Sequence, residues 1–347
     1  MAEQTLHGVN LAGWLVPEAW VTPALFSESG ATDESSLMER LGPERYEEVL
    51  GKHMDSFVDE VDFARMQARG INAVRIPVPW YVFGDAGPMP MGRTGCCRQL
   101  DRAFNWAEDH GIQVLLDVAS APLSGYTQDG LQIRLAPSLE VRIALLDVVT
   151  ALAVRYGDRR SLLGIEPLDE VQVCRRQGLR MGEGVALSFL RNFYRDAYDV
   201  IREAAGPDPV VVLSDGGMPG SWRAFMSHGR YQNVWLDCHL YHHLDTAPAG
   251  GPSGARWFVG ESRKQLEVAR KSGLPVMVGE WSAAMPGTST SITPEGRIAL
   301  ARVYTSGQLN CFEKCPAWFF QTWKTATLDP AWDARVALSS FDRDMLD

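Results

Sequence analysis

The stretch Leu162-Leu163-Gly164-Ile165-Glu166-Pro167-Leu168-Asp169-Glu170 is a short apolar run that ends in three carboxylates. Such a run predicts a buried strand, and acidic side chains are buried only where structure or chemistry requires them. A second stretch, Val276-Met277-Val278-Gly279-Glu280-Trp281, is again a short apolar run closed by a glutamate. If both runs are strands of one parallel barrel, their C-terminal ends face the same opening, and Glu170 and Glu280 can reach one substrate.

The rest of the chain alternates short apolar runs with amphipathic stretches. We predict eight strands, at His7–Leu11, Ala73–Pro77, Val114–Val118, Leu163–Pro167, Val210–Ser214, Val234–His239, Val276–Glu280 and Ala317–Thr322. We predict helices at Phe57–Arg69, Leu100–His110, Val141–Tyr156, Leu187–Ala204, Trp257–Ser272 and Pro294–Leu309. Eight alternations without a low-complexity linker predict one (β/α)8 barrel domain over residues 1–347. A doubly wound sheet is the alternative, but no Gly-x-Gly-x-x-Gly turn follows the first strand.

Composition narrows the class of protein. The chain has 347 residues and a formal charge of −10 with acids and bases interleaved, which argues against nucleic acid or an anionic membrane surface as its main partner. Its first residues lack a basic segment followed by an apolar one, and no apolar run is long enough to cross a bilayer, so we predict a cytoplasmic protein. The six cysteines fit neither a disulfide framework nor a zinc site and are expected to be free thiols.

Three segments rich in Gly and Pro follow predicted strands. They are Gly84–Gly95 after the second strand, Ala119–Gly130 after the third and Thr246–Gly254 after the sixth. Barrel active sites are built from loops on this face. We expect these segments to form walls or lids of the site, although a plain surface loop is the default interpretation of any such stretch.

The two glutamates suit the cleavage of a glycosidic bond with retention. That reaction needs a protonated acid at the leaving oxygen and an ionised nucleophile below the anomeric carbon, with the carboxyl groups ~5–5.5 Å apart. We assign Glu170 as the acid/base and Glu280 as the nucleophile; the alternative is that both are ion-pair partners at strand ends. Glu166 comes earlier in its strand and is expected to be buried in a salt bridge, for which Arg75 is the candidate partner.

Further residues are predicted to surround this pair. Arg75 interrupts an apolar strand, and its rigid guanidinium can hold a carboxylate ionised and oriented. His239 and Tyr241 are two residues apart and therefore share one face of a strand. Three histidines lie in this stretch, but only His239 has the inward phase, so we expect no metal. Trp323 is the candidate for stacking on a sugar ring.

The motifs together resemble glycoside hydrolase family 5 proteins of the exo-β-1,3-glucanase type. The likeness runs in order along almost the whole chain, through His7–Val16, Thr22–Phe26, His53–Phe63, Gly70–Pro77, Gly111–Asp117, Gly164–Glu166, Phe193–Tyr198, Gly279–Ser282 and Thr322–Thr325. The resemblance implies a single barrel. It also places Glu170 on the family's acid/base, Glu280 on its nucleophile, Arg75 on the arginine beside the nucleophile, and His239 and Tyr241 on its His-x-Tyr pair.

The chain departs from the family's pattern where the sugar is read. Asp169-Glu170-Val171 stands where the family has Asn-Glu-Pro, so a carboxylate replaces an amide donor to the sugar 2-hydroxyl. Ala119-Ser120 replaces a His-Gly, Gln321 replaces an aromatic residue before Thr-Trp-Lys, and Ala326 replaces an acid. We therefore count Asp169 and Gln321 among the substrate-binding candidates.

Two hypotheses follow. In the first, the protein is a retaining β-glycosidase or transglycosidase that acts on a small β-glycoside. In the second, the family 5 scaffold has been recruited to a non-glycosidic acid/base reaction, such as a cyclisation, dehydration or isomerisation in a biosynthetic pathway. Both imply a small-molecule substrate, and no motif requires a cofactor. The oligomeric state stays open.

Overall fold

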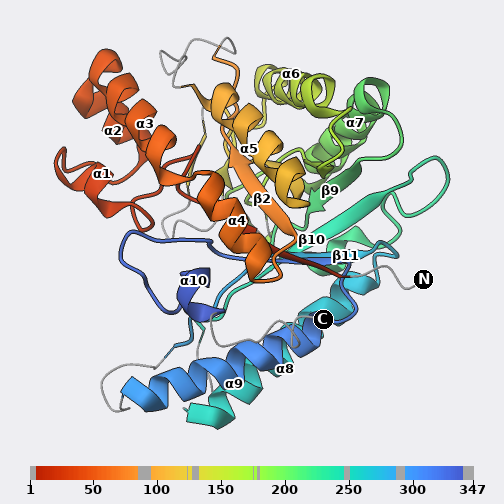
Figure 1. Ribbon diagram of the computed structural model, residues 1–347. Helices are drawn as coiled ribbons and strands as arrows, with labels where there is room; N and C mark the ends of the chain where they lie inside the picture. Colours follow the sequence, from red (N-terminus) through yellow and green to blue (C-terminus); the bar gives the residue numbers. More distant parts are fainter. Residues whose placement is uncertain are drawn as a thin grey trace.

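The computed structural model describes residues 5–84, 95–122, 124–126, 133–174, 176–177, 180–245, 251–286 and 294–338. Eight parallel strands close into a barrel in the order β1-β12-β11-β10-β9-β6-β3-β2 (Figure 1). Their bounds are β1 Leu6–Asn10, β2 Ala73–Val78, β3 Gln113–Val118, β6 Leu162–Glu166, β9 Val210–Ser214, β10 Val234–Leu240, β11 Val276–Trp281 and β12 Ala317–Phe320. The predicted (β/α)8 barrel is confirmed, and each predicted strand ends within about two residues of the observed one because the apolar runs are bounded by turn residues.

The helices surround this barrel. Their bounds are α1 Pro23–Ser27, α2 Glu34–Leu41, α3 Pro43–Phe57, α4 Glu60–Ala68, α5 Cys96–His110, α6 Leu139–Tyr156, α7 Leu187–Ala205, α8 Gly251–Arg270, α9 Pro294–Phe312 and α10 Ala334–Ala337. All six predicted helices are present. Between β9 and β10 the chain forms only the short 3-10 helix η1, Pro219–Trp222, and no full helix was predicted there.

Local capping explains the helices that periodicity missed. The segment between β1 and β2 holds α1, α2 and α3 in addition to the predicted helix. Asp33 caps α2 in a reciprocal capping box with Ser36, and Pro43 occupies the first turn of α3, where a missing N–H costs nothing. α1 and α2 are short, so their ends carry more information than their pattern. α3 is a helix of 15 residues that buries Tyr46, Leu50 and Met54 at helical spacing, and the prediction overlooked this pattern.

The predicted loops fare differently. Residues 85–94 of the first lie outside the described residues. The second contributes β4, Gly125–Tyr126, which pairs with β5, Ile133–Arg134, in a small antiparallel hairpin. Residues 246–250 of the third also lie outside the described residues. The rest of the third is not a loop, because α8 begins at Gly251 and takes up residues 251–254. A proline in the first turn does not break a helix. The loop after β6 carries a further hairpin of β7, Arg176–Gln177, and β8, Arg180–Met181.

The inside of the barrel has two layers. Toward the N-terminal ends of the strands lies an apolar layer composed of Ala73, Leu115, Val210, Val212, Met277, Ala317 and Phe319, which we call the lower layer. A Cβ on Gly8 would lie 2.2 Å from the Phe319 ring, so this glycine lets the aromatic ring fill the barrel. Two residues further along their strands, Arg75 and Asp117 share the inward phase of Ala73 and Leu115 and are completely buried.

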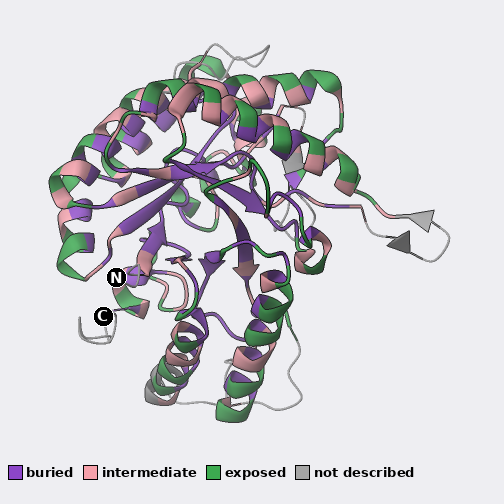
Figure 2. Cartoon of the chain, turned by 90° about the vertical axis from the view of Figure 1, so that its right-hand side faces the viewer, coloured by how far each residue is buried: buried purple, intermediate pink, exposed green. Residues whose placement is uncertain are grey.

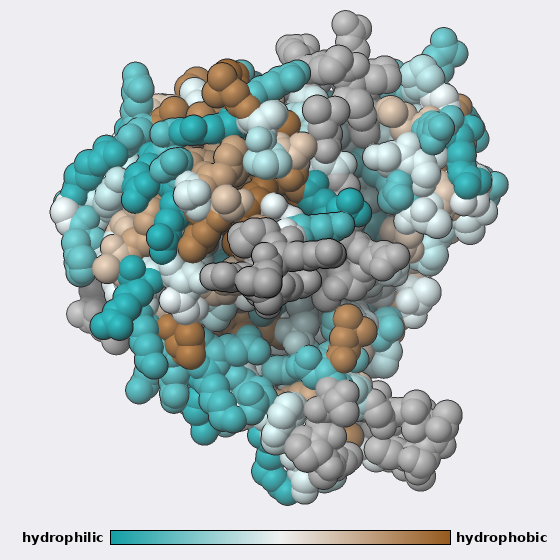
Figure 3. Space-filling model, turned by 180° about the vertical axis from the view of Figure 1, so that it is seen from behind, coloured by the Kyte–Doolittle hydropathy of each residue, from teal (hydrophilic) through white to brown (hydrophobic). Residues whose placement is uncertain are grey.

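A larger core lies between the strands and the helices, and the outer helix faces meet solvent. Figure 2 shows the buried residues concentrated in the strands and the inner helix faces, with α8 and α9 side by side below the barrel. Seen from behind, the described surface is largely hydrophilic with hydrophobic patches (Figure 3). None of the described helices combines the length and apolar character that a membrane span requires.

Candidate active site

Arg75 is the centre of the charged layer at the C-terminal ends of the strands. Its Nε and Nη2 lie 3.0 Å from Glu166 Oε2, and its Nη1 lies 3.0 Å from Glu280 Oε1. Its Nη2 also lies 2.8 Å from Asp169 Oδ1 and 3.2 Å from Asp117 Oδ2. One planar fork therefore fixes four carboxylates, which come from β3, β6, the segment after β6, and β11.

The surroundings of the Glu280 carboxylate suit a nucleophile. Arg75 donates to its Oε1, and the Tyr241 hydroxyl donates to its Oε2 at 2.5 Å. Burial and the nearby Asp169 raise the pKa of the Glu280 carboxyl, and His239, Arg75 and the Tyr241 hydroxyl limit the rise. Donors thus face both oxygens of Glu280, and they hold the carboxylate in one orientation.

The residue before Glu280 has to be glycine. The Gly279 amide donates to Asp237 Oδ1 at 2.5 Å, and a Cβ on Gly279 would lie 1.8 Å from Asp237 Oδ2. A side chain here would displace a buried carboxylate. The small residue lets β10 and β11 approach closely enough for Tyr241 to reach Glu280.

Glu170 has a different environment. Its backbone φ is +28°, an uncommon value for a residue with a side chain and typical of strained functional positions. Its Oε1 lies 2.5 Å from His239 Nδ1. Burial raises the pKa of the Glu170 carboxyl to about 8, with His239 lowering it and Glu280 and Asp169 raising it further. At neutral pH this carboxyl can carry a proton and donate it.

His239 connects the two glutamates. Its Nδ1 lies 2.5 Å from Glu170 Oε1 and 3.5 Å from Glu280 Oε2, so the two carboxylates converge on one ring nitrogen. Its Nε2 lies 3.1 Å from Asp237 Oδ2. Burial by itself would lower the pKa of His239, but Glu170, Glu280 and Asp237 raise it well above its usual range. The imidazole is therefore a cation between acids.

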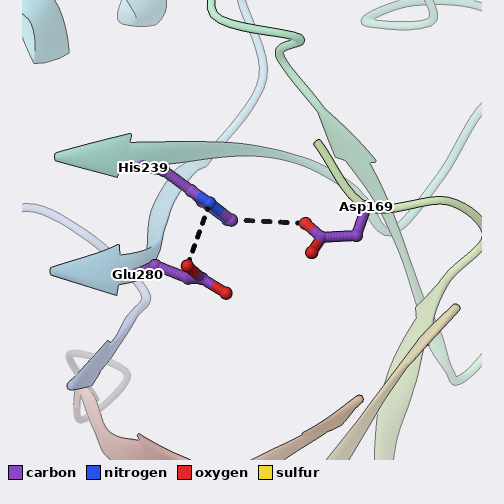
Figure 4. A group of neighbouring side chains, drawn as sticks. All are labelled: Asp169, His239 and Glu280. Atoms are coloured by element: carbon purple, nitrogen blue, oxygen red, sulfur yellow. Dashed lines mark ion pairs between the residues drawn. The ribbon is translucent and has the colours of Figure 1, made fainter. Parts of the chain in front are cut away.

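Asp169 completes the group. Figure 4 shows His239 between the carboxylates of Asp169 and Glu280, with all three side chains pointing to a common space. The His239 Nε2 to Asp169 Oδ1 distance is 3.8 Å. Oxygen and nitrogen atoms of Asp169, His239 and Glu280 lie within 4.8 Å of one another, as do those of Asp117, Glu166 and Asp169. Both sets touch Arg75, whose guanidinium already supplies a cation to them.

The structure thus brings six predicted residues together: Arg75, Asp169, Glu170, His239, Tyr241 and Glu280. Glu166 is paired with Arg75, as interpreted from the sequence. The stacking role predicted for Trp323 is wrong for this conformation. Its ring is only 1% exposed, its indole N–H donates to Asp62 Oδ1 at 3.0 Å, and Arg69 covers it.

Gln321 lies at the end of β12, beside the nucleophile's strand. Its backbone N–H donates to the Trp281 carbonyl at 2.8 Å, and the residue is 6% exposed. The side-chain Oε1 is buried without a hydrogen-bond partner in the described structure. The predicted contact of Gln321 with substrate stays a prediction.

Sequence reasoning missed two groups. Glu18 accepts from the Gly13 amide at 3.1 Å and from Trp20 Nε1 at 2.7 Å, and burial raises its pKa to about 7 with Glu280 and Asp169 adding to the shift. The Trp332 ring packs 5.7 Å from Tyr241 and 5.3 Å from Trp20. Glu18 follows the first strand, and this position at a barrel mouth was the available signal.

Comparison with known proteins agrees with this geometry. The family model for cellulase (glycosyl hydrolase family 5) matches residues 45–301. The probable glucan 1,3-beta-glucosidase A of Aspergillus fumigatus is 30% identical over 96% of this chain and 86% of its own length. The glucan 1,3-beta-glucosidase of Schwanniomyces occidentalis is 27% identical over 92% of this chain and 83% of its own.

A solved structure shows the same fold over the full length. The rutinosidase from Aspergillus niger aligns with a TM-score of 0.78 and 16% identity, covering 99% of this chain and 98% of its own. Because the family model spans most of the barrel and the relatives span nearly the whole chain, this protein belongs to glycoside hydrolase family 5 and is a glycoside hydrolase.

Proposed function

We propose that this enzyme is a retaining β-glycosidase with Glu170 as acid/base and Glu280 as nucleophile, acting on a small β-glycoside. The observation that carries the assignment is the difference between the two carboxyls that meet at His239. Glu280 faces donors on both oxygens, whereas the one side-chain hydrogen bond of Glu170 among the described residues is to His239, and its pKa is raised to about 8. Two acids in contrasting environments are the pattern that divides nucleophile from proton donor.

The first step forms a covalent intermediate. A Glu280 oxygen attacks the anomeric carbon from the face opposite the leaving group, and the bond to the leaving oxygen breaks as Glu170 gives that oxygen its proton. Arg75 and Tyr241 hold the attacking carboxylate in place. The products of this step are a glycosyl ester on Glu280, an ionised Glu170 and the free aglycone alcohol.

The second step releases the sugar. Ionised Glu170 takes a proton from water, the water oxygen bonds to the anomeric carbon, and the ester bond to Glu280 breaks. Two inversions give net retention, and Glu170 is protonated again. An acceptor alcohol in place of water would give transglycosylation by the same route.

The relatives guide the choice of substrate. The relatives named glucan 1,3-beta-glucosidase support a β-glucoside as the substrate. The aromatic pair of Trp20 and Trp332, close to Tyr241, offers apolar faces at the mouth. The hypothesis of a recruited non-glycosidic reaction is not favoured, because the glutamates, Arg75, His239 and Tyr241 form one connected centre.

Chemical rescue with azide tests the two roles separately. In Glu280→Gly an aryl β-glycoside should react with azide directly and give the α-glycosyl azide, because the attack inverts configuration once. In Glu170→Gly, with a good leaving group, azide should attack the glycosyl ester and give the β-glycosyl azide. Glu166→Gln is the control carboxyl and should give neither product. Both variants yielding the same anomer, or no product from either, would rule out the assignment.

We also propose that the enzyme works in a reducing compartment. Cys97, Cys174, Cys238, Cys311 and Cys315 are free thiols, and Cys238, Cys311 and Cys315 are buried. Free thiols persist where glutathione and thioredoxin keep them reduced. Fractionation of the source cells tests this: recovery of the protein in the extracellular medium would contradict it.

A further inference from the structure

The centre of the site holds more negative than positive groups. Asp117, Glu166, Asp169 and Glu280 all lie within 3.2 Å of Arg75, and Asp237 is 4.0 Å away. The second cation is His239, which is shared between Glu170 and Asp237. Two cations therefore serve six carboxyl groups around the place where the sugar binds.

The negative charge can be balanced in two ways. Protons can neutralise the carboxyls that are enclosed in the barrel, and a cation can pair with a carboxylate that is partly exposed. Asp117 and Glu166 are completely enclosed, and burial raises the pKa of both carboxyls well above the usual range, so protons can neutralise them. Asp169 lies higher, with a side chain that is 12% exposed, and its Oδ1 already accepts from Arg75 at 2.8 Å. Of the carboxylates gathered on Arg75, Asp169 is among those that a bound molecule can reach.

The position of Asp169 defines the part of a sugar that it would meet. Its oxygen lies within 4.8 Å of the Glu280 oxygen, and both side chains point to the same space (Figure 4). When Glu280 is bonded to the anomeric carbon, the one ring carbon next to it is a single bond away, so its substituent is the sugar group within reach of a side chain this close to Glu280. A hydroxyl there can bond to an amide or a carboxylate, whereas an ammonium favours the carboxylate.

We propose that Asp169 makes this enzyme selective for glycosides with an ammonium group on the carbon next to the anomeric carbon, that is, 2-amino-2-deoxy-β-glycosides. The inference rests on the proposed retaining mechanism at the same site. An ammonium supplies the positive charge that Arg75 and His239 leave short, in a site where burial strengthens charge interactions. The N-acetylated sugar brings bulk and no charge, so it gains nothing from Asp169.

Kinetics with matched substrates test the selectivity. The probes are 4-nitrophenyl β-D-glucopyranoside, its 2-amino-2-deoxy analogue and its 2-acetamido analogue, at pH 6 and low ionic strength. In the wild type, kcat/KM for the amino sugar should exceed that for the glucoside by about tenfold or more, the size of one charge-assisted hydrogen bond. In Asp169→Asn the ratio should fall by about tenfold or more, because the amide carries no charge.

Asp245→Asn is the matched control. This variant also removes one carboxylate after β10, but Asp245 pairs with His242 and is absent from the Arg75 cluster. The amino-to-hydroxy ratio should therefore stay at the wild-type value. A wild-type ratio of one or less, or a ratio that Asp169→Asn leaves unchanged, would overturn the role of Asp169.

Binding separates failure of this inference from failure of the mechanism. Calorimetric titration measures the binding of two non-hydrolysable aryl thioglycosides, one with an amino group and one with a hydroxyl on the carbon next to the anomeric carbon. The measurement needs no turnover, so it also works for an inactive variant. Preferential binding of the amino compound that is lost in Asp169→Asn supports selectivity even if azide rescue fails. Successful azide rescue together with equal binding of the two compounds, or with no binding of either, rejects selectivity while leaving the mechanism intact.

Discussion

The barrel interior has an apolar lower layer and a charged upper layer, which lie two residues apart along the same strands. In the lower layer Ala73 and Leu115 pack with Met277 and Phe319 in an apolar cluster. In the upper layer the next inward positions of these strands carry Arg75 and Asp117, completely buried and ion-paired. Backbone, strand order and face are identical, so the side chains alone decide that one layer stabilises the barrel and the other performs chemistry.

The difference teaches where this enzyme places its unfavourable interactions. Each buried apolar side chain of the lower layer contributes about 1.5–3 kcal/mol by leaving water. Buried charges in the upper layer cost desolvation energy that pairing only partly returns. The left-handed backbone of Glu170 lies just above the upper layer as well. Strain and charge therefore collect where substrate binds, above a layer that has neither.

The largest contrast is expected from one substitution in each layer of β11. Glu280→Gln should reduce kcat/KM on an aryl β-glycoside by at least about 10⁴-fold, because the amide neither attacks nor carries charge. Met277→Leu conserves volume in the lower layer and should leave kcat/KM near the wild-type value. Steady-state assays on both variants test this. Comparable losses in the two variants would mean that the layers are not functionally separate.

The next effect is on stability. Arg75→Met should lower the free energy of unfolding by about 3–5 kcal/mol, because it leaves buried carboxylates without their cation. The loss should be smaller at pH 5 than at pH 8, since those carboxyls can then take up protons. Arg230→Met removes an exposed pair with Asp199 and should leave the unfolding midpoint unchanged. Urea titration followed by circular dichroism gives both values, and equal destabilisation would refute the special role of the upper layer.

Two glycines sharpen the comparison further. Gly8→Ala forces a Cβ against the Phe319 ring in the lower layer, and Gly279→Ala forces one against the Asp237 carboxylate in the upper layer. Both should destabilise the fold by about 1–3 kcal/mol through overpacking. Only Gly279→Ala should also reduce kcat, because it moves Asp237 and through it His239. Thermal unfolding and kinetics on the pair provide the test, and an active Gly279→Ala would contradict it.

The smallest effect is a pH dependence. Because burial raises the pKa of Glu170 to about 8, the proton donor is present below that pH, and kcat/KM should fall about tenfold per pH unit above it. The folded state holds this proton more tightly than the unfolded chain, whose ordinary pKa is 4.5. The stability contributed by that proton is therefore fully present below pH 4.5 and is lost as the pH rises through about 8.

Glu170→Gln isolates this group. The variant should lose the part of the pH dependence of the unfolding midpoint that lies between about pH 4.5 and 8, while the remaining dependence persists. Differential scanning calorimetry across that range measures it. An unchanged profile in the variant would show that Glu170 titrates at its ordinary pKa.

The sequence by itself determined the barrel and most of its charged centre. Short apolar runs located all eight strands, and acids after the runs from Leu162 and Val276 located Glu170 and Glu280. Helices α1 and α2 were not predicted because short helices leave little periodicity, whereas the helical spacing of Tyr46, Leu50 and Met54 in α3 was overlooked. The role of Trp323 was misjudged because residue type and position near a strand end do not reveal which way a ring points.

Only the tertiary structure decided that Asp117 and Asp169 also share Arg75. Arg75, Asp169, His239 and Glu280 come from segments as much as 205 residues apart, and no spacing in the chain relates their side-chain atoms. Glu18 joins them through loop geometry for the same reason. The pattern of a strand is local and can be read from the sequence. Burial, pKa values and ion pairs depend on distances that exist only once the barrel has closed.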